Sequence, residues 1–139
     1  MILINTASRI REAIDNPVLT ARIDDSLSDL KTFFMHPEFH ALLETVGENG
    51  EFIDTINGRI INPGHCIETA WFILEESRYR GWDKEMLETA LTILDWSWGV
   101  GAGIRDFGGI INFRDCRNLP VQDYSQDMKV LVAADGSNH

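Results

Sequence analysis

The sequence predicts an all-α fold of paired antiparallel helices, with short β-hairpins in the loops that connect them. Two observations support this fold class. Several segments repeat apolar residues at intervals of three and four, as one side of a helix requires, and no series of strand-like segments could build a central sheet. With 139 residues, 44% of them hydrophobic, the chain is long enough for one core and too short for two. We therefore expect one domain or part of one, with its functional surface in the connecting loops.

Two helices are expected on either side of Asn16-Pro17. The first runs from Ile4 to Ile14 and ends there because proline disfavours helical backbone in the residue before it. The second has a stripe of apolar residues spaced four, four, three and four apart. These are Leu19, Ile23, Leu27, Leu30 and Phe34. A short helical turn is expected between Glu38 and Thr45.

Two longer helices and two hairpins are expected in the rest of the chain. The helices cover Pro63 to Arg80 and Asp83 to Trp98, and their apolar faces again follow a helical period. The expected face of the first consists of Ile67, Ala70, Trp71, Phe72 and Leu74; that of the second consists of Met86, Leu87, Ala90, Leu91 and Leu94. One hairpin is predicted around Asn49-Gly50, within 46–53, and the other after Gly108-Gly109, where Ile110, Ile111 and Phe113 follow.

Composition excludes several classes of function. A formal net charge of −10 repels nucleic acid and anionic membrane surfaces, so a small neutral substrate fits better. No stretch approaches the roughly 20 apolar residues of a membrane span, and nothing resembles a signal peptide. Cys66 and Cys116 have neither disulfide-scaffold nor metal-site spacing, and His36 and His40 add no metal motif. We expect a cytoplasmic protein without a metal.

The residues best suited to carry out chemistry are Asn62-Pro63-Gly64-His65, which begin one of the predicted helices. Asn62 is a good N-cap residue and proline is favoured at the first helical position, so His65 falls in the first turn, where the helix dipole disfavours imidazolium. A neutral histidine can accept a proton. Glu68 lies on the same face, three residues on, and Gly64 leaves room for a ligand. The simpler interpretation is a helix cap with one more polar residue in its first turn.

Other acidic pairs are most simply solvated helix faces. They are Asp24-Asp25, Glu44 with Glu48, and Glu75-Glu76. A glycoside hydrolase would need two facing carboxylates, and no pair stands out. A non-enzymatic helical interaction module remains an alternative.

Asn62 to Glu68, followed by the aromatic-rich 69–74, resembles the N-acylglucosamine 2-epimerase family. Leu43 to Val46 and Gly50 to Arg59 are also similar to that family, and the resemblance runs from about Ile23 to Lys129. Asn62-Pro63 before Gly-His points to the N-acyl sugar branch rather than to cellobiose 2-epimerases and mannose isomerases.

The resemblance implies an (α/α)6 barrel that interconverts N-acetylglucosamine and N-acetylmannosamine by removing and returning the C2 proton. His65 matches one of two catalytic histidines. Glu68 matches a residue that contacts substrate or orients the histidine, and Asn62 and Gly64 are expected to bind substrate. No cofactor is implied. ATP modulates some relatives, but no ATP-binding segment is identifiable in this sequence.

The length and the C-terminus depart from the family. About twelve helices of about 12 residues need more chain than is present, so residues 1–129 are expected to form about half a barrel, an internal fragment without the second histidine and inactive alone. Codons can be chosen for 132–139 that read as family sequence in a shifted frame, so 130–139 is expected to be a frayed, frameshifted tail. A similar slip is suspected within 99–106, whose glycines predict flexibility. Exposed helix faces favour pairing of chains.

Overall fold

The computed structural model of the chain describes residues 1–14, 16–101 and 109–121. Its long helices are α1 (Ile2–Ala13), α2 (Pro17–Asp29), α4 (Pro63–Tyr79) and α5 (Lys84–Gly101). A π-helical turn, η1 (Leu30–Phe34), continues α2, and the short η2 (Pro37–Phe39) and α3 (Ile56–Arg59) lie in the connection to α4. The four predicted long helices are therefore confirmed, with ends that differ by a few residues.

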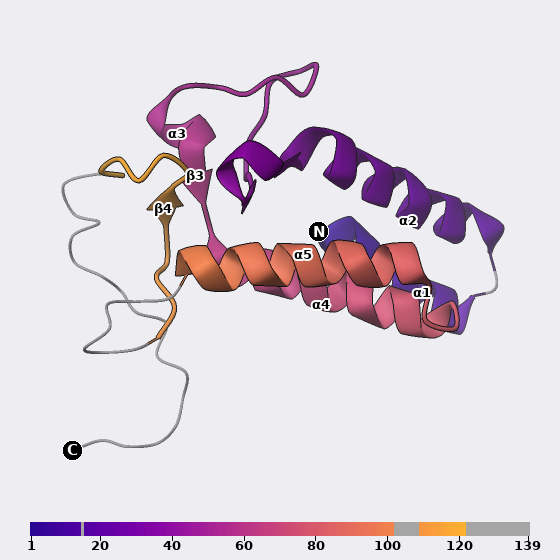
Figure 1. Cartoon of the computed structure of the whole chain (residues 1–139). Helices are drawn as coiled ribbons and strands as arrows, with labels where there is room; N and C mark the ends of the chain where they lie inside the picture. The colour runs from indigo at the N-terminus through magenta and orange to yellow at the C-terminus, as the bar shows by residue number, and fades with distance from the viewer. Residues whose placement is uncertain (15, 102–108, 122–139) are drawn as a thin grey trace.

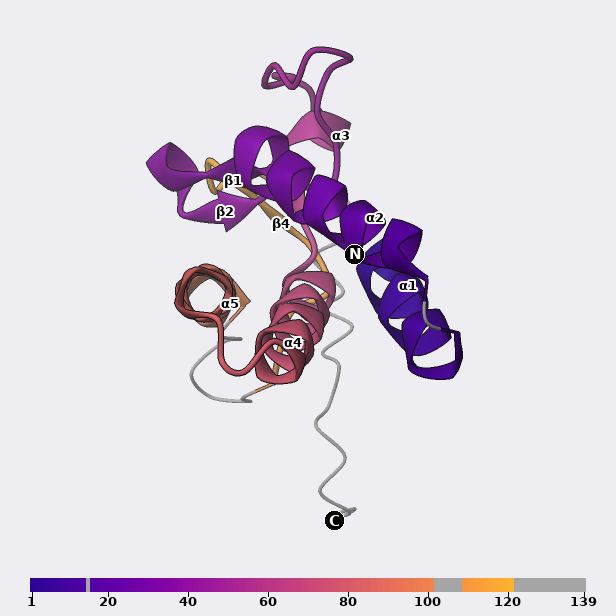
Figure 2. The ribbon, with the colours of Figure 1, turned by 90° about the vertical axis from the view of Figure 1, so that its right-hand side faces the viewer.

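The helices pack as two antiparallel pairs, α1 with α2 and α4 with α5 (Figure 1). Seen nearly along α4 and α5, α4 lies between α5 and α1 (Figure 2). Each pair has a short connection, as antiparallel neighbours allow. Because α4 and α5 run in opposite directions, the start of α4 and the end of α5 lie at the same end of the molecule (Figure 1).

The Asn16-Pro17 pair, at which the first helix is predicted to end, also begins α2. Asn16 accepts a hydrogen bond from the backbone N–H of Val18 at 3.0 Å, and Pro17 is the first residue of α2. The C-terminal end of α5 lies three residues past the predicted end at Trp98, so Gly99 to Gly101 are helical. These three residues therefore belong to a helix, and 102–103 lie outside the described part; the expected flexibility of the glycine-rich stretch stays a prediction.

Two small antiparallel sheets lie in the connections. β1 (Met35–His36) pairs with β2 (Ala41–Leu42), and β3 (Ile60–Ile61) pairs with β4 (Arg114–Asp115). The predicted hairpins are therefore misplaced. A turn does form at Gly50, whose N–H donates to the carbonyl of Gly47 at 2.9 Å, but no strand is assigned within 46–53. The second expected hairpin is replaced in the described residues by a pairing between segments more than 50 residues apart.

Residues 38–45 are also only partly as expected. The helical turn predicted there is limited to η2 (Pro37–Phe39), because His40 adopts a left-handed conformation with φ 46° and the chain then enters β2. A left-handed residue cannot continue a right-handed helix. This turn sends Ala41, Leu42 and Leu43 into the core, where all three are buried.

The core lies between the helix pairs and continues beneath the sheets. The predicted stripe of α2 is confirmed, since Ile23 and Leu27 are buried, as is Leu30 in the following turn. The face predicted for α4 is confirmed at Ala70 and Phe72, which are buried, but Trp71 is 51% exposed and Ile67 and Leu74 are only partly buried. The buried face of α4 consists of Cys66, Thr69, Ala70, Phe72, Ile73, Glu76 and Ser77. The prediction missed the polar members of this face because residues that form internal hydrogen bonds were assigned to the solvent side.

The prediction was furthest from the structure at Glu76. This residue was expected on a solvated helix face, but its side chain is fully buried. Its carboxylate accepts two hydrogen bonds from Arg11, at 2.9 and 2.7 Å, one from Arg80 at 2.6 Å and one from Ser8 at 2.9 Å. Arg80 also pairs with Asp24 at 2.7 Å. This cluster fastens α1 and α2 to α4, at the end of α4 away from His65.

The described residues form a helical domain with small sheets, and their helices do not close into a barrel (Figures 1 and 2). None of the described helices is both long and apolar enough to cross a membrane. The predicted tail at 130–139 lies outside the described residues.

Candidate functional site

The site is organised by the start of α4, and Asn62 is the N-cap that the sequence predicts. Its side-chain oxygen accepts a hydrogen bond from the backbone N–H of His65 at 3.1 Å, and its carbonyl accepts one from Cys66 at 3.0 Å. Asn62 is buried, and β3 leads directly into it. The chain therefore reaches His65 through a segment that is fixed on both sides, by strand pairing before and by helix after.

The imidazole of His65 is half exposed and meets one carboxylate, that of Glu44. Both oxygens of Glu44 lie 3.2 Å from Nδ1 of the ring. Sequence reasoning missed this residue and placed it on a solvated helix face, although its side chain is only 34% exposed. The one available signal is that Glu44 directly follows the apolar run Ala41–Leu43, which enters the core.

The other predicted site residues are near the histidine in the chain, and among the described residues none of them forms a hydrogen bond or ion pair with its ring. Glu68 is exposed, and it forms no side-chain hydrogen bond or ion pair within the described residues. Gly64 is the second residue of α4 and is partly buried. The expected substrate contacts of Glu68, Gly64 and Asn62 stay predictions. In this structure the Asn62 side-chain oxygen is engaged in the cap.

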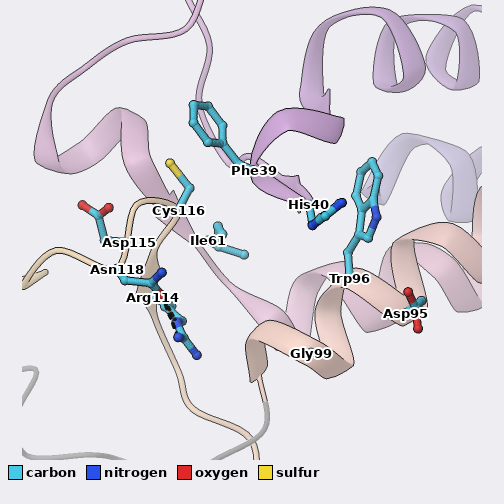
Figure 3. Close-up of a pocket in the computed structure, with 10 residues that line it drawn as sticks. All are labelled: Phe39, His40, Ile61, Asp95, Trp96, Gly99, Arg114, Asp115, Cys116 and Asn118. Atoms are coloured by element: carbon cyan, nitrogen blue, oxygen red, sulfur yellow. Dashed lines mark hydrogen bonds between the residues drawn. The ribbon is translucent and has the colours of Figure 1, made fainter.

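A cavity of about 380 Å³ opens at the same end of the molecule (Figure 3). Its wall combines η2 and its flank, β3, the end of α5, and β4 with the residues after it. The lining residues are Phe39, His40, Ile61, Asp95, Trp96, Gly99, Arg114, Asp115, Cys116 and Asn118. The rings of His40 and Trp96 lie 6.1 Å apart. His65 does not line this cavity, but Ile61, directly before its cap residue, does.

Ion pairs fix the strand that carries Ile61. Arg59 donates from Nε to the buried carboxylate of Asp115 at 2.7 Å and from a terminal nitrogen to Asp54 at 2.7 Å. Arg117 donates to the other oxygen of Asp54 at 2.7 Å. These hydrogen bonds from Arg59 and Arg117 hold the pKa of Asp54 below its usual range. The paired strands β3 and β4 are thereby joined by side chains as well as by backbone.

Comparison with known proteins identifies the family. The sequence profile described as N-acylglucosamine 2-epimerase (GlcNAc 2-epimerase) matches residues 12–131. The chain belongs to this family. It is 32% identical over 82 residues to the N-acylglucosamine 2-epimerase of Bos taurus, which is 58% of this chain and 19% of the relative. The protein of that name from Homo sapiens is 33% identical over 82 residues, 57% of this chain and 18% of the relative.

The chain therefore spans about a fifth of the length of the epimerases that it matches. The resemblance inferred from Asn62 to Glu68 is confirmed at the level of the family.

The thiol of Cys66, which is next to His65 in the chain, is made inert by its burial. Burial raises the pKa of this thiol to about 12, with a further contribution from the charge of Glu44. The sulfur lies 3.5 Å from the carbonyl oxygen of Leu42, inside the core. A protonated, buried thiol is a poor nucleophile. Within the described residues, no three histidine, cysteine or acidic side chains gather as a metal site.

Proposed function

We propose that this chain carries one of the two acid–base groups of a sugar 2-epimerase, and that the group is His65. The substrates are N-acetylglucosamine and N-acetylmannosamine. The observation that carries the proposal is the placement of His65: a half-exposed imidazole at the start of α4, backed by a carboxylate, within the matched family segment. A histidine in this position is accessible to a small molecule, and an imidazole can accept a proton and return it.

The reaction needs a base at C2 of the open-chain sugar. The C2–H bond is acidic because the adjacent C1 aldehyde takes up the electron pair. The base takes the proton, the pair moves into an enolate with its charge on the C1 oxygen, and a proton is then returned to C2. Return to the opposite face inverts the centre, and two groups on opposite faces perform this most directly. No redox change occurs, so we expect no cofactor requirement.

The chain alone is proposed to lack epimerase turnover. It spans about a fifth of the length of its relatives, and no hydrogen bond or ring contact joins His65 to a second histidine within the described residues. A single base returns the proton to the face from which it came. Deuterium exchange at C2 without inversion is the expected signature of one such group acting alone.

The deciding experiment incubates the chain with N-acetylglucosamine in deuterium oxide and follows C2–H and the two epimers by NMR. We expect exchange that is lost in His65→Ala, with no epimer formed. Sugar should also raise the melting temperature, and Glu68→Gln should reduce that rise. Epimer formation that disappears in His65→Ala would refute the single-base proposal. Absence of both exchange and a sugar-dependent melting shift would refute the assignment of His65.

Exposed apolar side chains support a further part of the proposal, the pairing of chains. Ile2, Leu3 and Ile10 on α1 are each more than 40% exposed, as are Leu91 and Trp98 on α5. Apolar side chains that helix faces leave exposed favour association with another chain. Sedimentation velocity over a range of concentrations tests this, and a monomer at every concentration would contradict it.

A further inference from the structure

Glu44 and His65 meet although they are 21 positions apart in the sequence, and the backbone of each is held by a different part of the fold. Glu44 follows Leu43, whose backbone N–H donates to the carbonyl of Phe34 at 3.0 Å and whose side chain is buried. His65 is held through its backbone N–H by the cap of α4. The backbones of both residues are therefore held in place by the core and by the helix start, and their side chains meet at 3.2 Å.

We propose that Glu44 is a positioning residue that fixes the neutral imidazole of His65 in the form with its proton on Nδ1. An ionised carboxylate has no proton to donate, so the nitrogen that faces it must be the donor. Both carboxylate oxygens face Nδ1, at equal distances. The lone pair of the neutral ring is then on Nε2, which makes no hydrogen bond within the described residues and belongs to a half-exposed side chain.

This arrangement gives Nε2 a defined chemical task. Nε2 is the atom that takes the proton from C2, and the imidazolium that forms stays paired with the carboxylate at Nδ1. The pairing also offsets the unfavourable field at the N-terminal end of α4, which acts against a positive ring. The use of this tautomer in catalysis rests on the proposed function, whereas the tautomer itself follows from the contact alone.

Glu44 is the carboxylate in contact with the ring, and its charge is also felt by two other groups. It adds to burial in raising the pKa of the Cys66 thiol, and it opposes the burial that lowers the pKa of the Met1 amino group. Glu68, one turn further along α4, has no such contact with His65 within the described residues. Glu68 is therefore a matched control: a nearby carboxylate on the histidine's own helix that does not face Nδ1.

The test is the tautomer of His65, read from long-range ¹H–¹⁵N spectra of the ¹⁵N-labelled full chain at a pH where the ring is neutral. His65→Ala assigns the resonances. We expect Nδ1–H in the wild type, a shift toward Nε2–H in Glu44→Ala, and no change in Glu68→Ala. Far-ultraviolet circular dichroism confirms that each variant is folded, and the partial exposure of Glu44 makes the alanine tolerable.

Two results would overturn the proposal: Nε2–H in the wild type, or a folded Glu44→Ala variant whose His65 keeps the wild-type tautomer. If Glu44→Ala does not fold, the wild-type spectrum decides alone. The measurement contains no sugar, so its failure is separate from that of the proposed function. If the chain shows no His65-dependent exchange at C2, the proposed function is refuted, but the measured tautomer still decides the present proposal.

Discussion

Replacing Glu76 with glutamine should be one of the most damaging single changes in the chain. The side chain of Glu76 is fully buried, and its partner Arg11 is 6% exposed with its guanidinium 3.9 Å from the ring centre of Tyr79. Glu76→Gln keeps the shape but removes the negative charge, so the arginine is left as a buried cation without its counter-charge. Arg80 keeps a partner in Asp24, at 2.7 Å.

The size of the effect follows from the burial of the pair. Breaking a buried ion pair by removing one partner costs about 3–5 kcal/mol, because the remaining charge is desolvated without compensation. With a urea m-value of about 2 kcal/mol/M, the unfolding midpoint should fall by about 2 M. Small domains are stable by only about 5–15 kcal/mol, so the variant should be close to unfolding.

The assay is urea denaturation followed by circular dichroism, with Glu12→Gln as the matched control. Glu12 pairs with Arg9 at 3.1 Å on the same helix as Arg11, but both side chains are 55% exposed. An exposed pair of this kind contributes about 0–1 kcal/mol. A double variant, Arg11→Met with Glu76→Leu, should regain most of the loss, because no unpaired charge remains. Equal midpoints for Glu76→Gln and Glu12→Gln would refute the reasoning.

The pKa of Glu76 adds a pH dependence with a definite sign. Burial opposes ionisation, but the hydrogen bonds from Arg11, Arg80 and Ser8 outweigh it and hold this pKa below its usual range. The unfolded chain therefore binds this proton at a higher pH than the folded chain. The stabilisation is fully present above the unfolded pKa and is lost as the pH falls through the folded pKa. Acid denaturation of Glu76→Gln should lack this component.

Substitutions at four further positions test local packing, helix capping and the burial of a thiol. Gly58→Ala should destabilise the chain strongly, because a β-carbon there would lie 2.1 Å from the carbonyl oxygen of Ile53. Gly99→Ala should be neutral or slightly stabilising, because a β-carbon there meets nothing within 4 Å. Thermal denaturation measures both effects. Asn62→Ala should lower the free energy of unfolding, measured by urea denaturation, by about 1 kcal/mol. Asn62→Asp should restore it, since aspartate can also cap the helix. The buried thiol of Cys66, whose pKa is raised to about 12, keeps a proton that the unfolded chain releases. Stability should therefore fall by about 1.4 kcal/mol per pH unit above the unfolded pKa, more steeply than in Cys66→Ser. Equal alkaline slopes, or equal effects of the two glycine substitutions, would contradict these expectations.

The sequence predicts the long helices well because their signals are local. The stripe of α2 and the caps at Asn16 and Asn62 depend on residues within one or two turns of each other. The buried face of α4 could not be predicted in the same way. Its position depends on α1 supplying Arg11 to neutralise Glu76, a contact across 65 residues. Without that partner, Glu76 belongs on the solvent side of any amphipathic pattern.

The strands and the site were harder to predict for the same reason. β3 and β4 consist of two residues each and are joined across more than 50 residues, with Arg59 and Asp115 bonded between them. No periodicity exists in two residues. His65 was found because its helix start is a local motif, whereas Glu44 was not, because its approach depends on the left-handed turn at His40.

These distant contacts imply that the stability of the loops and the geometry of the site are coupled. The backbone before His65 is held by β3, and β3 is held by β4 and by the Arg59 hydrogen bond to Asp115. The carboxylate that meets the histidine is held by a different segment, which enters the core at Leu43. A helix start alone therefore supplies an imidazole, but the orientation of the ring depends on two connecting segments, the one that ends in β3 and the one that carries Glu44. In this arrangement the helices provide the rigid support, and the irregular connections between them determine which nitrogen of the proposed His65 base carries the proton.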